Sequence, residues 1–159
     1  LANRASKAVL RCMPILLTAL LIPRPYGLVL PPDAKTAVLF LLSMILGFLV
    51  VVAFSMMIYI ATFFTLSPLG IRVISLSLVE FMSGGIIPLP FLPGRIRSIM
   101  ELLPFASMQN APYRIYSANI AGAAAVSTLS LQLFWVIALT VLGHYLMSLA
   151  LKHAVIQGG

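Results

Sequence analysis

The stretch SGGIIPLPFLPGRIRSIMELLPF, residues 83–105, is hydrophobic enough to lie in a membrane but cannot form one continuous helix. Its helix-breaking residues are Gly84, Gly85, Gly94, Pro88, Pro90, Pro93 and Pro104. Proline disrupts a helix interior, and irregular backbone at membrane depth persists only where protein or a water-filled cavity covers it. We therefore expect a membrane helix to end or bend at Gly84–Gly85, followed by a re-entrant or interfacial hairpin over residues 88–110.

Within this hairpin, residues 94–103 predict a short amphipathic helix that returns to the water boundary. Its charged residues are Arg95, Arg97 and Glu101, its apolar side holds Ile96, Ile99, Met100 and Leu103, and Pro104 should end it. The alternative is an ordinary proline-rich loop at the bilayer surface. We favour the hairpin because an exposed loop would not need the large apolar side chains Ile86, Ile87, Leu89, Phe91 and Leu92.

The composition of the whole chain indicates an integral membrane protein. It is 62% hydrophobic and 8% charged, whereas soluble domains have roughly 45–50% apolar and about 25% charged residues. Long unbroken apolar runs indicate helices rather than barrel strands. The single cysteine, Cys12, excludes an intramolecular disulfide and a cysteine-based metal site. The net charge of +7 is better explained by basic residues flanking membrane spans than by a nucleic-acid partner.

Four membrane-spanning helices are expected, at about residues 8–30, 37–65, 71–88 and 127–151, in a single all-α domain that covers residues 1–159. The first is the weakest, because its apolar run at residues 12–22 has 11 residues, short of the ~20 needed to cross. The second has no charge and no proline, and at about 43 Å long it should tilt or protrude. The expected fold is a polytopic helical bundle with the hairpin before its last span. Since the chain begins at Leu1 without a signal-peptide pattern, we expect an N-terminally truncated piece of a longer protein.

The connections between these spans set the predicted water boundaries. Residues 22–35, with four prolines, should form a loop at a membrane surface. A tight turn is expected at residues 65–72, where Pro68 and Gly70 should break the helix and Arg72 should mark the water edge. With four crossings, five Lys or Arg residues lie on each side, so the positive-inside rule gives no orientation.

The broken stretch also resembles the region after the fifth span of bacterial permeases in the type 2 class of ABC exporters. The family pattern is a Ser-Gly, a Pro-Leu, an aromatic-hydrophobic-Pro and a Leu-Pro-Phe. It is matched here by Ser83-Gly84, Pro88-Leu89, Phe91-Leu92-Pro93 and Leu103-Pro104-Phe105. The ending LKHAVIQGG, residues 151–159, is similar to the basic patch, short apolar run and terminal residues of that family. The spacing of the predicted spans fits the last four of the six spans in this family. The resemblance therefore covers the whole of this chain but only part of a typical family member.

This resemblance implies a six-helix permease fold whose first two helices are missing here, in the inner (cytoplasmic) membrane with both ends cytoplasmic. The broken stretch would be an extracytoplasmic hairpin, and two permease chains, identical or different, would form the pathway. ATP and Mg would be bound by a separate ATPase subunit that docks on cytoplasmic loops. This chain has no G-x-x-x-x-G-K-[ST] sequence and no expected cofactor or metal of its own.

Glu80 is the one acidic residue within a predicted span. A charge at the bilayer centre costs at least ~2.5–3.5 kcal/mol, so this side chain should face protein or water. It could lie in the substrate pathway with Ser83 and attract a cationic drug-like molecule. The alternative is a structural role as a hydrogen-bonding group near Ser77 or Ser83.

Two basic groups are candidates for contact with the ATPase subunit. Arg4, Lys7 and Arg11 share one helix face. The simplest interpretation is that this face contacts phospholipid, and the alternative is that it contacts the ATPase subunit. The resemblance implies a second cytoplasmic contact at the turn with Pro68 and Arg72. The outer hairpin would depend on Gly84, Gly85, Pro88, Pro93 and Pro104.

Three functions remain open from the sequence. The first is the membrane-spanning permease subunit of an ATP-driven ABC exporter that works by alternating access. The second is a non-transport membrane scaffold or assembly protein, and the third is a fragment of an ion-coupled secondary transporter. An enzyme is not expected, because three acids, two histidines and one cysteine leave few catalytic constellations, and no H-E-x-x-H or G-x-S-x-G sequence is present.

Overall fold

A computed structural model describes residues 10, 13–14, 17–18, 21–22, 30–65 and 67–157, with residues 153–157 described by their backbone alone. The chain divides into two compact units, Leu1–Pro31 and Pro32–Gly159. In the first unit, the described residues 10, 13–14, 17–18 and 21 are helical. Most of the expected span at 8–30 lies outside the described residues, and so do Arg4, Lys7 and Arg11.

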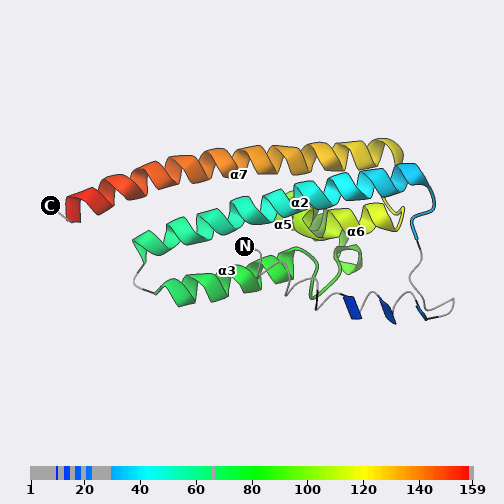
Figure 1. The fold of residues 1–159 in the computed structure, drawn as a ribbon, viewed down its shortest axis with the longest axis horizontal. Coiled ribbons are helices and arrows are strands. Elements are labelled where there is room, and N and C mark those ends of the chain that lie inside the picture. Colours follow the sequence, from blue (N-terminus) through cyan, green and yellow to red (C-terminus); the bar gives the residue numbers. More distant parts are fainter. Residues whose placement is uncertain are drawn as a thin grey trace. The chain divides into compact units, whose positions relative to one another are not determined.

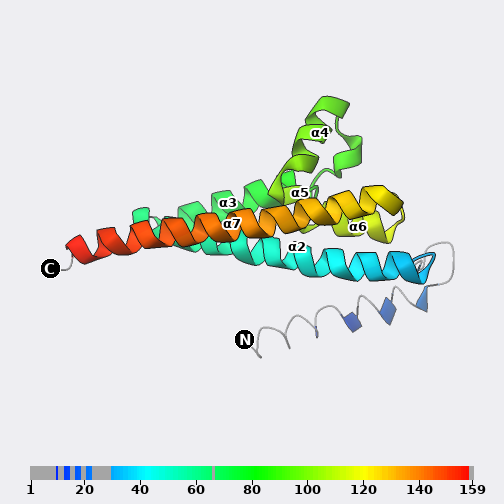
Figure 2. The same cartoon turned by 90° about the horizontal axis from the view of Figure 1, so that it is seen from above.

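The second unit is helical, and its described residues contain no strand. Its elements are α2 (Ala34–Ala61), η1 (Thr62–Phe64), α3 (Pro68–Met82), η2 (Leu89–Phe91), α4 (Gly94–Leu102), α5 (Pro104–Met108), α6 (Asn110–Tyr116) and α7 (Gly122–Gln157). Helices α2 and α7 lie side by side and run in the same direction, whereas α3 runs back alongside α2 (Figure 1). The short helices α5 and α6 lie against the first half of α2, and α4 projects away from the long helices (Figure 2).

Two of the described helices are long and apolar enough to cross a bilayer, namely Ala34–Phe64 and Gly122–Lys152. They confirm long helices in the segments predicted at 37–65 and 127–151. Helix α2 begins three residues earlier than expected because Asp33 caps it, accepting a hydrogen bond at 3.3 Å from the Thr36 backbone N–H. Helix α7 continues to Gln157, so Lys152 and His153 do not end it.

Helix α3 differs from the predicted 71–88 at both ends. The predicted break between the two helices is present between Phe64 and Pro68, but Pro68 and Gly70 lie inside α3 and not in the turn. Pro68 occupies the first helical position, where its missing N–H costs nothing, and Ser67 caps the helix by accepting from the Gly70 N–H at 3.3 Å. The helix ends at Met82, so its 15 residues extend about 22 Å, less than a bilayer core requires.

The end of α3 is fixed by the two glycines. Gly84 has φ of +86°, a left-handed conformation that side chains other than glycine rarely adopt. The Gly85 N–H then donates to the Glu80 carbonyl at 3.0 Å, which closes the last turn. Glu80 therefore lies in the last turn of α3, whereas a helix over residues 71–88 would have placed it near the middle.

The broken stretch folds into a chain of short helices. Helix α4 ends one residue before the predicted boundary, and Pro104 starts α5 rather than merely ending α4. Leu89, Met100 and Ala106 form a small buried cluster that holds η2, α4 and α5 together. The predicted apolar side of α4 is divided, because Met100 is buried in this cluster while Ile96 and Ile99 are exposed.

Candidate functional site

The residues predicted to line a pathway meet where α3 ends. Ser83 is 1% exposed, and its hydroxyl donates to the side-chain oxygen of Gln109 and to the Glu80 carbonyl, each at 3.4 Å. Glu80 itself is exposed, and within the described part of the chain its carboxylate has no hydrogen bond or ion pair. Neither Ser77 nor Ser83 bonds to that carboxylate, so Glu80 does not make the structural hydrogen bond considered above.

The side chains of Glu80 and Gln109 both lie close to Gly85. A Cβ atom added at Gly85 would lie 3.4 Å from Cγ of Glu80 and 3.4 Å from Oε1 of Gln109, and 3.0 Å from the Glu80 carbonyl oxygen. The structure thus brings Glu80 and Ser83, the predicted pathway residues, together with Gly85 from the predicted hairpin, and adds Gln109. Gln109 follows α5 directly, and no sequence pattern singled it out.

The other hairpin residues act through the backbone. A Cβ at Gly84 would lie 3.3 Å from Cγ of Leu89, in addition to the strain of its positive φ. Pro88 precedes η2, and Pro93 precedes α4, where its carbonyl accepts from the Arg97 N–H at 2.9 Å. Proline suits these positions because its fixed φ favours the start of a helix.

A groove of about 250 Å³ lies against the side of α2 next to this corner. Its lining residues are Met44, Phe48, Val51, Met108, Gln109, Pro112 and Tyr113, and we call it the methionine–aromatic groove. Helix α2 supplies one wall, while the end of α5 and the start of α6 supply the other. Gln109 belongs both to this groove and to the corner with Ser83 and Gly85.

A second hollow, of about 370 Å³, lies between the end of α2 and the start of α3. Pro68 and Arg72, predicted to contact an ATPase subunit, both line it with Tyr59 and Thr62. The structure thus joins these two predicted residues in one surface feature. Arg4, Lys7 and Arg11 cannot be placed beside them, because they lie outside the described residues.

A buried polar contact joins the two long helices and the hairpin. The Gln132 side chain on α7 is fully buried and donates to the carbonyls of Ser107 at 2.8 Å and Ser43 at 3.1 Å. It also accepts from the Ser43 hydroxyl at 2.9 Å. The sequence analysis missed this contact, although a lone amide in an apolar span was an available signal, since such groups often bond between membrane helices.

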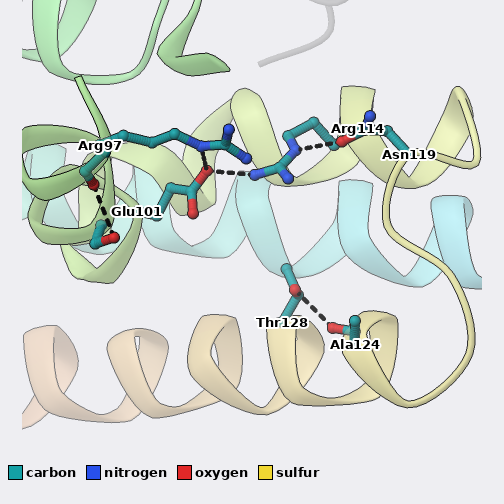
Figure 3. Close-up of polar contacts among 8 residues, drawn as sticks. Arg97, Glu101, Arg114, Asn119, Ala124 and Thr128 are labelled. Carbon is teal, nitrogen blue, oxygen red and sulfur yellow. Dashed lines mark hydrogen bonds and ion pairs between the residues drawn. The ribbon is translucent and has the colours of Figure 1, made fainter. Parts of the chain in front are cut away.

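Two residues of the predicted charged side of α4, Arg97 and Glu101, form an ion-pair cluster with Arg114 of α6 (Figure 3). Glu101 accepts from Arg97 Nε at 2.8 Å and also from Arg114 Nη1, and Arg114 Nε donates to Asn119 at 3.0 Å. These side chains are half-buried, since 30% of Glu101 and 16% of Arg114 is exposed. Glu101 therefore fastens α4 to α6 rather than lying free at a water boundary.

Neither the region around Glu80 nor the ion-pair cluster around Glu101 resembles a metal centre. The described residues contain no group of three or more His, Cys, Asp or Glu side chains that could hold an ion. What the geometry offers is a carboxylate without a partner in the described residues and an apolar groove, with Gln109 between them. This arrangement can bind an amphiphilic ligand, and it lacks the paired groups of acid–base or nucleophilic catalysis.

Comparison with protein families gives one match, to the family described as ABC-2 family transporter protein, over residues 8–158. No curated protein and no solved structure matches the chain. Because the match extends over nearly the whole sequence, the chain belongs to the ABC-2 transporter family. This confirms the family inferred from the broken stretch and identifies the chain as a membrane transport component rather than an enzyme.

Proposed function

We propose that this member of the ABC-2 transporter family is the membrane-spanning permease subunit of an ATP-driven exporter, working by alternating access with a second permease chain. The family match over residues 8–158 is the observation that carries the proposal. Two apolar helices of membrane-spanning length support it. ATP and Mg would be bound on a separate ATPase subunit, and the chain would lie in the inner membrane.

The direction of the helices favours several crossings. Since α2 and α7 run the same way, the chain between them has to return from one end of the bundle to the other (Figure 1). Helix α3 covers about 22 Å of this return, and the turn and η2 that follow continue it. We propose three crossings within residues 34–152, with α3 as a short middle crossing completed by the irregular backbone after Gly84. A fourth crossing would come from residues 8–30.

The hollow at the start of α3 and the corner at its end suit the two ends of such a permease. The hollow with Pro68 and Arg72 lies where α2 turns into α3, and we assign it to contact with the ATPase subunit together with Arg4, Lys7 and Arg11. The corner with Glu80 and Ser83 lies at the other end of α3, and we assign it to the substrate pathway. The hairpin from Gly84 to Pro104 would cover the outer end of that pathway.

The proposal is tested by purifying the full-length native protein in mild detergent and asking whether an ATPase subunit accompanies it. We expect a stoichiometric partner and ATP hydrolysis in the eluate. Arg72→Glu should reduce the amount of partner recovered, whereas the control variant Arg95→Glu, on α4 and away from the hollow that Arg72 lines, should not. If no ATPase appears in several detergents and in native-membrane nanodiscs, the scaffold and ion-coupled alternatives replace the exporter.

A further inference from the structure

We infer that the methionine–aromatic groove and Glu80 together bind a lipophilic organic cation, with the apolar body in the groove and the positive charge near the carboxylate. The inference rests on the proposed function in that the bound cation would be a transported substrate. It names a substrate class and a binding surface that the family match does not provide.

The walls of the groove suit an apolar or aromatic body. Met44, which is 49% exposed, offers a flexible thioether that adapts to ligands of different shape and contacts aromatic rings favourably, whereas the buried Met108 forms part of the groove floor. Phe48 and Tyr113 are 65% and 68% exposed, so both rings are available to a ligand. An aromatic face also attracts a cation directly, and the effect grows where water is excluded.

The charge of the site comes from the one described acid that has no partner. The chain has three acidic residues. Asp33 accepts the capping hydrogen bond of α2, and Glu101 is bonded to two arginines. Glu80 has no such partner within the described residues, and it lies on a surface with exposed Leu76 and Phe81.

The position of Glu80 on its helix strengthens this argument. A carboxylate in the last turn of a helix is unfavourable, because the helix C-terminus carries a partial negative charge. Glu80 is two residues from the end of α3, so it does not stabilise the helix. A bound cation would interact favourably with the carboxylate and with the helix end together.

Gly85 and Gln109 lie between the Glu80 side chain and the methionine–aromatic groove. Gln109 lines the groove, and a Cβ on Gly85 would contact both Gln109 and the Glu80 side chain. Two contacts of 3.4 Å from the same added Cβ place Glu80 Cγ no more than 6.8 Å from Oε1 of Gln109, the groove residue nearest this corner. Lipid acyl chains would fill an apolar groove equally well, but they would gain nothing from a carboxylate at its end.

The experiment measures binding of radiolabelled tetraphenylphosphonium to the purified full-length protein in nanodiscs, without nucleotide. We expect saturable binding that Glu80→Gln and Phe48→Ala each weaken by about tenfold, and that Glu80→Asp largely retains. Phe63→Ala is the matched control, because Phe63 is also 65% exposed but lies on η1 outside the groove. Tetraphenylborate, an anion of the same shape, should bind no more weakly to Glu80→Gln than to the native protein.

The inference would be overturned if the native protein did not bind tetraphenylphosphonium. It would also be overturned if the native, Glu80→Gln and Phe48→Ala proteins bound it equally. An equal loss in Phe63→Ala would overturn it as well, because that loss would indicate partition onto any exposed aromatic surface. Size-exclusion profiles of all variants establish that they are folded. The ATPase recovered from the same preparation reports on the proposed function separately, since binding without nucleotide does not require it.

Discussion

The two glutamates of this chain lie in corners of opposite character. Glu101 is half-buried, accepts hydrogen bonds from Arg97 and Arg114, and fastens α4 to α6. Glu80 is exposed at the end of α3, without a partner in the described residues, and has Gly85 as a neighbour in common with Gln109 of the apolar groove. A carboxylate in an apolar chain can thus stabilise the fold through ion pairs or stay available to a ligand, depending on whether basic side chains lie next to it.

The largest expected effect on stability separates these two glutamates directly. Glu101→Gln should lower the free energy of unfolding by roughly 1–2 kcal/mol, because two guanidinium groups lose their carboxylate, with solvent screening part of the loss. Glu80→Gln should leave stability unchanged within about 0.5 kcal/mol. Thermal unfolding of the two variants in the same detergent is the measurement. Equal losses would contradict the division of roles.

A second prediction extends the comparison to the buried amide. Gln132→Leu should destabilise the protein by about 1 kcal/mol, because Ser43 and the Ser107 carbonyl lose their partner. Gln109→Leu is the control, since Gln109 is exposed and its contact with Ser83 is long, at 3.4 Å. Melting temperatures that fall equally in both variants would show that the buried contact has no special weight.

The glycines beside Glu80 give a third prediction. Gly84→Ala should cost about 1 kcal/mol, because alanine is strained at a φ of +86°. Gly94→Ala should be neutral or stabilising, since no atom lies within 4 Å of an added Cβ there and the residue is helical. A thermal-shift assay on the pair checks this, and a destabilised Gly94→Ala protein would count against the described start of α4.

The smallest effect is expected in the turn between α6 and α7. Ala118 has φ of +54°, and it is the one non-glycine residue with positive φ in the described part of the chain. Ala118→Gly should raise the free energy of unfolding by about 0.5 kcal/mol. This is the strain relieved at a positive φ minus the entropy cost of ordering glycine, which is freer than alanine in the unfolded chain. A lower melting temperature in Ala118→Gly would contradict the described turn.

Much of the fold could be predicted because it depends on local sequence. The uncharged run after Lys35 predicted α2, and the apolar run after Ser127 predicted α7. Prolines on both sides of residues 94–103 predicted α4 to within one residue. Local breakers set these boundaries whatever the rest of the chain does.

Other features could not be predicted, because they depend on context. Proline can break a helix or begin one, and the capping hydroxyl of Ser67 decides in favour of the second at Pro68. Several helix-breaking residues follow Phe81, and the sequence does not show at which of them α3 ends. The helix ends at Met82 and not at residue 88, so Glu80 lies in its last turn and not near its middle. The groove and the Gln132 contact join residues far apart in sequence, such as Ser43 and Gln132, so packing alone brings them together.

The most direct test of the account is ATP-driven accumulation of tetraphenylphosphonium in inside-out vesicles from cells that make the full-length protein. The account predicts accumulation with ATP but not with a non-hydrolysable analogue, persistence after a protonophore collapses the proton gradient, and a loss of about tenfold in Glu80→Gln. Accumulation that requires the proton gradient, or that never exceeds vesicles lacking the protein, would contradict it.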